Sequence, residues 1–466
     1  MNTAEELLDV LVVGAGLSGL ALAWKLKRAG CTFLVCQAGE RVGGAITTAI
    51  ADGFVCEGGP NSFQESPPLI ELLTQLQLED QIVTADPRLA RFVWWENRLR
   101  SVPLTPAQLV RSDLLSWSGK ARLLWELFVP ALGEPREETV AEFVLRRFGE
   151  EVLSRLVDPL VSGMCAGDVG QLSIEATFER LVDLERRHGG VLRGLWRTAR
   201  TRPPFKRLCT LRGGLEQLPQ ALAQRLQPQI LLSHRLEALE HLAGDRWRAV
   251  VAGPQGEPVA IAARTVILSG SAHAMASVLR PLDAGLGRAL ESIYYPPVVS
   301  ISLAYSKSQV PNAPEGFGHL IPRNQTLRSL GVIWNSSLFP HTAPPNWRLY
   351  TCFVGGTTDP ATPNLSDTEL ASLAHRELQT VLGFQAGYQL LRVTRWPQAI
   401  PQYALGHPSK QERVERALLG LPGLFLVGNY FGGISLGDCV RHSGAVASRV
   451  LQFLTTVASN GSLRPA

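Results

Sequence analysis

Three glycines near the start of the chain, Gly14, Gly16 and Gly19, have the spacing of a phosphate-binding turn. They follow an apolar segment, residues 9–13, and precede a segment with the spacing of an amphipathic helix. In such a strand–turn–helix unit the first glycine allows the sharp turn, the second lets the backbone approach a pyrophosphate, and the third lets helix and strand pack closely. The helix N-terminus adds N–H groups and a partial positive charge. This pattern predicts the binding of a dinucleotide.

Gln37 ends the next apolar segment, residues 32–36, where dinucleotide-binding proteins usually carry an Asp or Glu that accepts hydrogen bonds from the ribose. An amide can still hydrogen-bond a hydroxyl, but it brings no charge. Two further glycine-rich loops follow at once, Arg41–Gly44 and Glu57–Asn61. Backbone that stays close to its ligand over three loops favours a long, extended cofactor, which FAD fits better than NAD. The alternative interpretation is that the two later loops are surface turns.

A fourth glycine-rich loop lies near the C-terminus and opens the last helical segment. It contains Gly428, Gly432, Gly433 and Gly437. Backbone N–H groups at such a helix start would stabilise the negative charge that collects near N1 and the C2 carbonyl of a reduced flavin. Taken alone, the loop is an ordinary glycine turn before a helix. Together with the N-terminal turn, it favours a flavin site.

Composition and charge exclude several other classes of protein. The chain has 466 residues, 45% of them apolar, enough for two or three domains. Its 45 Lys and Arg are balanced by 41 Asp and Glu without a long run of one sign, so nucleic acid is not an expected partner. No segment approaches the ~18 apolar residues of a membrane span, and we expect no signal or transit peptide before the first strand. We therefore expect a cytoplasmic location or a position at the membrane surface facing the cytoplasm.

Residue spacings give no support to metal or nucleophilic catalysis. The seven cysteines include no C-x-x-C pair, the histidines show no H-x-x-x-H spacing, and no serine lies in a G-x-S-x-G elbow. Cys31 and Cys36 have the C-x4-C spacing of a redox pair. They flank one strand and lie on its opposite faces, which favours two buried small residues over a disulfide.

The order of the predicted elements indicates an α/β fold with a discontinuous Rossmann-like domain. Helical spacing dominates from Thr105 to about Arg202, strands return near Cys209, a separate sheet follows over 298–355, and residues 424–427 resume the first pattern. We predict an FAD-binding domain, a mixed-sheet substrate-binding domain and a helical insert. Their predicted boundaries are, in that order, 1–86 with 208–285 and 420–466, then 87–104 with 286–419, then 105–207.

Several motifs distributed along nearly the whole chain resemble those of one enzyme superfamily. The segments are Arg41–Gly44 with Ile46–Thr48, Glu57–Gln64, Asp158–Gly163, Gly316–Gly318, Phe353–Gly356, Ala399–Tyr403 and Gly428–Tyr430. The first resembles the FAD-dependent amine oxidase and desaturase superfamily as a whole. The G-P-N-S-F and A-I-P-Q-Y stretches are more restrictive and resemble the protoporphyrinogen oxidases of plant chloroplasts and cyanobacteria. The resemblance implies a fold like that of p-hydroxybenzoate hydroxylase and the amine oxidases.

The resemblance also implies a reaction and a set of site residues. The reaction is the six-electron oxidation of protoporphyrinogen IX, with non-covalent FAD as hydride acceptor at flavin N5 and O2 as final oxidant, and it needs no catalytic side chain. Arg91 would pair with a propionate, Leu320 and Ile333 would lie against one pyrrole ring, Phe353 would stack on another, and the backbone of Gly163 would orient the macrocycle. The implied cofactor-binding residues are Gly14, Ala15, Gly16, Leu17, Ser18, Gly19, Gln37, Ala38, Arg41, Gly43, Gly44, Gly58, Gly59, Pro60, Asn61, Trp396, Gly428, Asn429, Gly433, Ile434, Ser435 and Leu436.

The sequence around Arg91 independently favours a role in binding a carboxylate. It lies in an otherwise apolar segment, residues 89–93, and a guanidinium there stays ionised and binds a carboxylate through two hydrogen bonds. The alternative is an outward-facing arginine on an edge strand. By default Leu320, Ile333 and Phe353 are core residues of short strands, and only the family resemblance assigns them to a pocket.

The sequence leaves several alternatives open. Coproporphyrinogen III, with four propionates, is the nearest rival substrate; arginine at position 91 favours protoporphyrinogen. A flavin amine oxidase would usually place a lysine near the flavin, and neither Lys307 nor Lys410 is convincing in that role. A carotenoid desaturase would need a long apolar tunnel, and a flavin-stabilised tetrapyrrole-binding protein without turnover is the non-enzymatic alternative.

The helical insert carries apolar and basic residues with the character of an interfacial helix. Leu123, Leu124, Leu127 and Phe128 lie beside Arg111, Lys120 and Arg122. We expect peripheral membrane contact there, with a buried amphipathic helix as the alternative. A homodimer is also compatible with the family resemblance.

Overall fold

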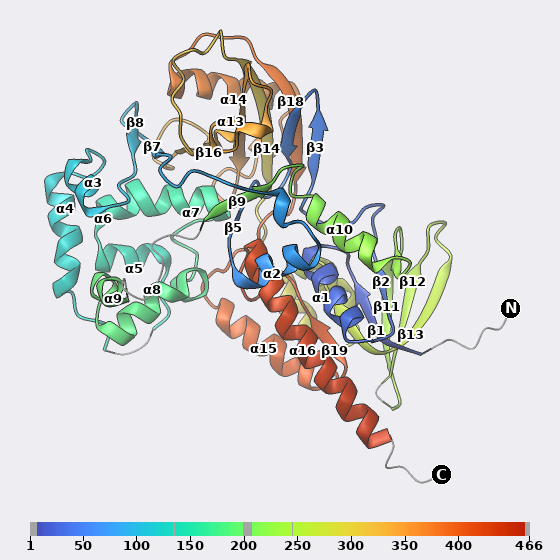
Figure 1. The fold of residues 1–466 in the computed structure, drawn as a ribbon. Helices are drawn as coiled ribbons and strands as arrows, with labels where there is room; N and C mark the ends of the chain where they lie inside the picture. Colours follow the sequence, from blue (N-terminus) through green and yellow to red (C-terminus); the bar gives the residue numbers. More distant parts are fainter. Residues whose placement is uncertain (1–6, 134–135, 199–206, 245, 462–466) are drawn as a thin grey trace.

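Two large sheets, the helices that cover them and a helical insert make up the computed structural model, which describes residues 7–133, 136–198, 207–244 and 246–461. Within these ranges each large sheet has seven strands. The helices between residues 106 and 198 gather at one end of the molecule, and the strand at residues 8–13 lies toward the opposite end (Figure 1). The mixed α/β class predicted from the element order is confirmed.

The first sheet is built around the N-terminal strand. β1 (Leu8–Val13) pairs in parallel with β2 (Phe33–Cys36) on one side and with β13 (Pro258–Leu268) on the other. The remaining strands are β10 (Ile230–Leu231), β11 (Arg235–Leu242), β12 (Arg246–Ala252) and β19 (Leu424–Leu426). The predicted returns of the chain after Cys209 and near the C-terminus are therefore confirmed.

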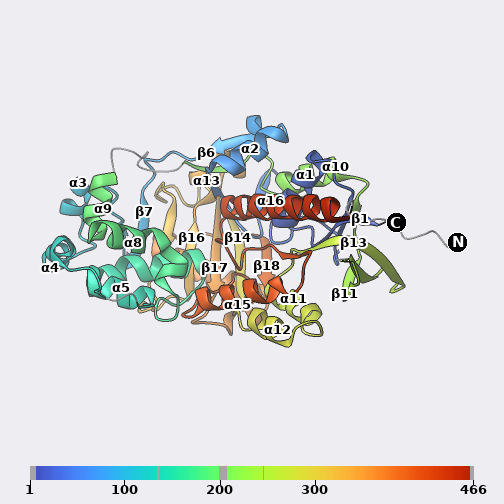
Figure 2. The same cartoon turned by 90° about the horizontal axis from the view of Figure 1, so that it is seen from below.

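Helices cover both faces of this sheet, as its continuous apolar strands require. One face packs against α1 (Leu17–Arg28), α10 (Gln217–Leu226) and α16 (Leu436–Gly461). The other packs against α11 (Ala272–Leu279), α12 (Ala284–Glu291) and α15 (His407–Leu419). Figure 2 shows the two helical layers on opposite sides of the strands.

The second sheet is mixed, and part of it comes from a segment far earlier in the chain. Its strands, in spatial order, are β18 (Gln389–Trp396), β14 (Val298–Ser306), β17 (Trp347–Gly355), β16 (Ser329–Ile333), β15 (Gly318–Leu320), β7 (Arg91–Trp95) and β8 (Arg98–Ser101). One face packs against α14 (Asp367–Leu382) in a compact apolar core. β7 and β8 form an antiparallel hairpin that turns at Glu96 and Asn97.

Short elements connect the two sheets. β3 (Thr48–Ala51) and β4 (Phe54–Glu57) form a hairpin, and β5 (Phe63–Gln64), β9 (Leu208–Leu211) and β6 (Ile82–Thr84) form a small sheet. α2 (Pro67–Gln75) and α13 (Asn335–Leu338) complete this region. α2 begins at Pro67, because proline suits the first helical turn.

The insert between β8 and β9 is helical as far as Thr198, and the predicted end near Arg202 lies outside the described residues. Its elements are α3 (Pro106–Arg111), α4 (Trp117–Leu124), the 3₁₀ turn η2 (Trp125–Phe128), α5 (Val140–Arg147), α6 (Glu150–Val152), the π-helical turn η3 (Leu153–Val157), α7 (Asp158–Cys165), α8 (Ile174–His188) and α9 (Val191–Thr198). They enclose an apolar core of their own. The division of the chain into three domains stays a prediction.

Candidate functional site

The turn between β1 and α1 has the geometry of a phosphate-binding loop. Gly14 has φ +106°, and a Cβ there would lie 2.9 Å from the carbonyl oxygen of Ser269, while a Cβ on Gly19 would overlap the carbonyl oxygen of Gly14. A Cβ on Gly16 would meet no atom within 4 Å. No side chain caps α1 and its first turn holds no acidic residue. The turn therefore presents open space and uncapped N–H groups, which fits a pyrophosphate.

Gln37 braces this turn from the end of β2. Its Oε1 accepts a hydrogen bond from the N–H of Ala15 at 2.9 Å. The side-chain acceptor expected for a ribose is thus occupied by the protein itself, and the Nε2 donor is the group left for a hydroxyl. Ala38, the next predicted contact, is exposed.

The second glycine loop lies directly against the first. Gly43 forms a β-bridge with Gly16, and a Cβ on Gly44 would lie 3.3 Å from the Cα of Gly16. The Arg41 guanidinium donates to the carbonyl oxygens of Gly44 at 2.6 Å and Ile46 at 3.2 Å. Arg41 therefore acts on the shape of the loop. The predicted cofactor-binding residues from these two loops lie together.

The third loop is held by side chains from the second sheet. The Gly58 carbonyl oxygen accepts from Trp396 Nε1 at 2.7 Å and from Ser300 Oγ at 3.0 Å. Arg392 donates to the Cys56 carbonyl oxygen at 2.8 Å, and a Cβ on Gly58 would lie 2.7 Å from this guanidinium. Sequence reasoning missed Ser300 and Arg392. Each is one polar residue of a strand, and no local pattern distinguishes it.

Asn61 extends the same loop toward β16. Its Nδ2 donates to the Gly59 carbonyl oxygen at 3.1 Å, and its Oδ1 accepts from Asn335 Nδ2 at 2.9 Å. Asn335 is buried and its own Oδ1 has no hydrogen-bond partner. The pair connects the cofactor loop to α13, which follows the strand that carries Ile333.

Glu57 ties the third loop to the region after β9. Its carboxylate accepts from the N–H of Leu215 and from Thr48 Oγ1, both at 2.8 Å. Burial raises the pKa of Glu57 to about 7. The nearest cation, Arg392, opposes this shift only in part.

The C-terminal loop has a left-handed backbone and leads into α16. Gly433 has φ +108°, and its N–H donates to the hydroxyl of Tyr403 at 3.1 Å. The predicted donors that remain available to a ligand are therefore the N–H groups of Ile434, Ser435 and Leu436. Ser443 Oγ donates to the Ser18 carbonyl oxygen at 2.9 Å, which packs α16 on the first turn of α1.

The predicted substrate residues Arg91, Leu320, Ile333 and Phe353 share one face of the second sheet. Across the strands, Arg91 pairs with Gly318 and Gly318 with Ile333, while Leu320 pairs with Gly331 and Gly331 with Phe353. Directly paired residues, and residues two apart along a strand, point to the same face. Each of the four side chains is half-buried. The residues between them, such as Val332 and Cys352, point into the core under α14.

α7 covers part of this face. A Cβ on Gly163 would overlap Cδ2 of Leu320, so the helix approaches the sheet at the one position without a side chain. Leu160 and Met164, one turn apart on α7, stay 45% and 46% exposed, which is unusual for apolar residues beside a core. Sequence reasoning missed both, although their i, i+4 spacing around Gly163 was visible.

Arg91 is a cation without a carboxylate partner among the described residues. Its guanidinium carbon lies 5.2 Å from the centre of the Phe317 ring. Burial lowers the pKa of Arg91, and no neighbouring charge opposes this shift. A half-buried guanidinium that has no carboxylate partner is suited to binding the anionic group of a ligand.

The face also leads to the cofactor loops. Phe353 pairs across β17 and β14 with Ser300, whose hydroxyl binds the Gly58 carbonyl oxygen. The structure therefore brings the substrate residues and the third glycine loop to one side of one sheet.

The described part of the chain gives less support to cysteine chemistry, to a metal site and to a membrane span. All seven cysteines, each in the described ranges, are free, and burial raises the pKa of Cys36 to about 12. No three His, Cys, Asp or Glu side chains in these ranges are placed to hold a metal ion. None of the described helices has the length and apolar character needed to cross a membrane.

The nucleotide-binding turn, the three loops beside it and the mixed second sheet define a flavin-dependent oxidoreductase. The model of the flavin-containing amine oxidoreductase family matches residues 17–451. A chloroplastic protoporphyrinogen oxidase of Oryza sativa is 36% identical, over 97% of this chain and 89% of its own. A coproporphyrinogen III oxidase of Bacillus subtilis is 28% identical, over 96% and 98%.

A crystal structure from Exiguobacterium, of a protein provisionally described as a protoporphyrinogen oxidase, superposes with a TM-score of 0.82 at 25% identity, over 96% of this chain and all of its own. The chain therefore belongs to the flavin-containing amine oxidoreductases and, within them, to the protoporphyrinogen oxidase family. It is an FAD-dependent enzyme.

Proposed function

We propose that the protein oxidises protoporphyrinogen IX to protoporphyrin IX. Six electrons and six hydrogens leave the substrate in three two-electron steps, and each step reduces one O2 to H2O2. The observation that carries the proposal is the unpaired, half-buried Arg91 on an apolar sheet face that leads to the third glycine loop.

Four segments would hold the cofactor. Bound FAD supplies the hydride acceptor. The first turn of α1 and Gly16 would take the pyrophosphate, and Gln37 would donate to a ribose hydroxyl. The loop at Gly58 to Asn61, with Trp396 behind it, and residues 428–436 would enclose the ring end. The binding is non-covalent: acid precipitation should leave the flavin in solution, and flavin in the pellet would contradict it.

The substrate face would hold the macrocycle by one charged contact and several apolar ones. Arg91 would receive a propionate, Phe353 would stack on one pyrrole ring, and Leu320 and Ile333 would cover another. Gly163 lets α7 approach from the other side, because any side chain there would displace Leu320. These residues orient the substrate toward the cofactor and exclude water, and hydride removal requires no acid or base from the chain.

The direct test uses the purified yellow protein under anaerobic conditions. Protoporphyrinogen IX should bleach the flavin and produce porphyrin fluorescence, and admission of air should restore the flavin colour. If the porphyrinogen leaves the flavin oxidised, the proposal is wrong. Bleaching by an aliphatic amine instead would favour the amine oxidase alternative.

Coproporphyrinogen III is the second candidate, because a coproporphyrinogen oxidase is among the relatives. Arg91 provides one unpaired guanidinium on this face, which suits a substrate with two propionates better than one with four. We expect a higher kcat/KM with protoporphyrinogen IX. A higher value with coproporphyrinogen III would reverse the assignment.

We also propose that the helical end of the molecule contacts a membrane surface facing the cytoplasm. Trp117, Leu124, Trp125, Phe128 and Trp196, here called the aromatic tip, are 73%, 57%, 61%, 73% and 80% exposed. They belong to α4, η2 and α9. Exposed aromatic residues that gather in this way favour an interface with lipid.

Two of the three basic residues expected beside them have other roles, and only Arg111 of the three is exposed. Lys120 is buried, its Nζ lies 4.2 Å from the centre of the Trp117 ring, and it donates to the Val110 carbonyl oxygen. Arg122 donates to the carbonyl oxygens of Arg146 and Arg147. Leu123 packs against the core of the insert. Membrane contact would thus rest on apolar insertion more than on charge.

A further inference from the structure

Tyr403 ends the A-I-P-Q-Y motif, which the proposed function leaves without a role. We propose that Tyr403 is a positioning residue for the cofactor: its hydroxyl holds the loop of residues 428–433 in the shape that directs the N–H groups of 434–436 toward the flavin. The inference rests on the proposed placement of FAD at this loop.

The hydroxyl of Tyr403 bridges the two limbs of the loop. It donates to the Asn429 carbonyl oxygen at 2.6 Å and accepts from the N–H of Gly433 at 3.1 Å. A phenol has one proton to donate and lone pairs to accept, so one hydroxyl satisfies both groups. Gly432 and Gly433 both have positive φ and carry no side chain, so the shape of this limb depends on contacts from outside the loop.

The ring of Tyr403 is itself fixed in place. It stacks on the His407 ring with centres 4.2 Å apart and an angle of 19°. The Tyr403 carbonyl oxygen accepts from the N–H of Ser173 at 2.8 Å. The residue is 8% exposed, and burial raises the pKa of its phenol, so the hydroxyl keeps its proton. A donor held this rigidly can determine the position of a flexible loop.

Gln402, the residue before Tyr403, contacts α7 and not the C-terminal loop. Gln402 Nε2 donates to the carbonyl oxygen of Cys165, the last residue of α7, at 2.9 Å. Because α7 carries Gly163 against Leu320, Gln402 acts on the wall of the substrate face while Tyr403 acts on the cofactor loop. This separation predicts different kinetic effects for the two residues.

Loosening the loop would weaken the interaction of its N–H donors with a reduced flavin more than with an oxidised one. Those donors stabilise negative charge, and the reduced ring carries more of it. Loss of the two Tyr403 hydrogen bonds should therefore make reduction of the bound flavin less favourable. We expect a change of about tenfold in the equilibrium, which for a two-electron couple is about 30 mV.

Tyr403→Phe tests the inference, and Tyr305→Phe is its matched control. Tyr305 is a buried tyrosine whose hydroxyl bonds His375 Nδ1 at 2.9 Å and whose ring also stacks on that histidine, but it lies in the core under the second sheet. The midpoint potential of bound FAD is measured on both holoproteins and on the parent protein. FAD affinity is measured by reconstitution of the apoproteins, whose melting temperatures report folding.

We expect the potential of Tyr403→Phe to fall by about 30 mV and its FAD affinity by roughly tenfold, with KM for porphyrinogen within twofold of the parent. Tyr305→Phe should keep the parent potential. Gln402→Leu should raise KM and leave the potential unchanged. A potential in Tyr403→Phe equal to that of the parent overturns the inference.

The measurements distinguish a failure of the proposed oxidase function from a failure of the positioning role of Tyr403. A parent protein that porphyrinogen cannot bleach contradicts the proposed function, whatever the potential of the variant. A parent that turns over, beside a Tyr403→Phe with unchanged potential, contradicts only the positioning role. If Tyr403→Phe gives no folded holoprotein, Tyr403→His keeps a ring to stack on His407, and the same fall in potential is required of it.

Discussion

Arg91 is the residue on which substrate recognition most directly depends in the proposed function. Its neighbours on the sheet face offer apolar surface, which holds a tetrapyrrole without fixing its orientation. A charge-assisted, bidentate contact with a propionate would fix it, because the carboxylate can meet the guanidinium in few geometries. The absence of a carboxylate partner among the described residues leaves the guanidinium available for that contact.

Replacing Arg91 by alanine should raise KM for protoporphyrinogen IX by one to two orders of magnitude, since a charged hydrogen bond contributes about 1.5–3 kcal/mol. The maximal rate and the flavin content should change much less. Steady-state kinetics measure this, with Arg98→Ala, an exposed arginine on the adjoining strand, as the control. An unchanged KM in Arg91→Ala would exclude the assignment.

We expect His407 to make the protein less stable in acid. Burial, and to a lesser degree the charge of Lys410, lower the pKa of His407 to about 4 from its ordinary 6.5. The unfolded chain thus binds a proton more readily than the folded one below pH 6.5. The contribution to the free energy of unfolding is full above that pH and declines, by up to about 3 kcal/mol, as pH falls toward 4.

Melting temperatures of His407→Phe and the parent protein between pH 7.5 and 4.5 check this expectation. The variant keeps a ring against Tyr403 but has no group that titrates, so its melting temperature should fall less on acidification. Parallel curves for the two proteins would show that His407 contributes nothing to acid sensitivity.

Single residues were predictable from sequence where the backbone itself requires a residue type. Gly14 and Gly19 are examples, because any side chain would collide with the backbone around them. Gln37 was placed correctly at the strand end, but its bond to Ala15 was not foreseeable, since the choice between ribose and backbone depends on the turn's exact shape. Ser300 and Tyr403 could not be predicted, because their partners lie far away in the sequence.

Among the elements, strands with alternating or continuous apolar residues were predicted well, and the five helices α11 to α15 were missed. For α14 the signal was available: Ser366 and Glu369 form a capping box, and Gly383 ends the helix in a left-handed conformation. α15 offers little, because only His407 and Val414 are buried on it and the rest of its surface is polar. Its position is determined by packing against α12 and the first sheet.

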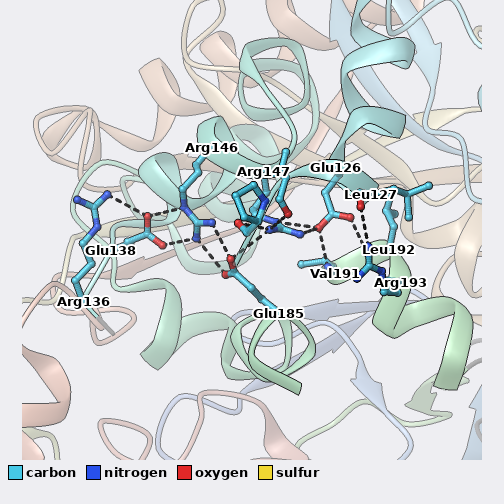
Figure 3. A network of polar contacts seen from close by, with 12 residues as sticks. Glu126, Leu127, Arg136, Glu138, Arg146, Arg147, Glu185, Val191, Leu192 and Arg193 are labelled. Atoms are coloured by element: carbon cyan, nitrogen blue, oxygen red, sulfur yellow. Dashed lines mark hydrogen bonds and ion pairs between the residues drawn. The ribbon is translucent and has the colours of Figure 1, made fainter. Parts of the chain in front are cut away.

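The helical insert contains a buried ion network, defined as Glu126, Glu138, Arg146, Arg147 and Glu185 (Figure 3). Arg147 and Glu126 are fully buried and paired, and Arg146 joins Glu138 at 2.6 Å to Glu185 at 2.7 Å. Glu126 also accepts from the N–H of Val191 at 2.7 Å, at the start of α9. The network therefore holds η2 and α9 together, and with them the two parts of the aromatic tip.

Arg147→Met should destabilise the protein by about 3–5 kcal/mol, because it leaves Glu126 buried without its cation. Unfolding of the protein in urea, or its melting temperature, measures this loss of stability. Arg187→Met removes an arginine of an exposed pair on α8 and should change stability by less than about 0.5 kcal/mol. Equal effects of the two substitutions would argue against the network as a source of stability.

For the whole molecule, a few contacts determine how the cofactor and substrate regions meet. Ser300 and Trp396 bring the second sheet to the third glycine loop, and the segment at Gln402 and Tyr403 connects α7 to the C-terminal loop. These residues come from distant parts of the chain. Sequence order predicted that the first sheet is discontinuous, but only the three-dimensional arrangement shows which residues join the parts.

The helices that carry the aromatic tip, α4 and α9, lie at the end of the molecule opposite β1 and β2, so the tip would contact a membrane without the first sheet (Figure 1). We expect the FAD-loaded protein to float with liposomes that contain anionic lipid. Because Lys120 and Arg122 are engaged within the protein, raised salt should reduce flotation only slightly.

Phe128→Ser with Trp196→Ser should abolish flotation, since the apolar area available for insertion is then greatly reduced. Leu419→Ser, which removes an apolar side chain that is 82% exposed on α15, should float like the parent. A parent protein that stays wholly at the bottom of the gradient at low salt would contradict membrane contact by this surface.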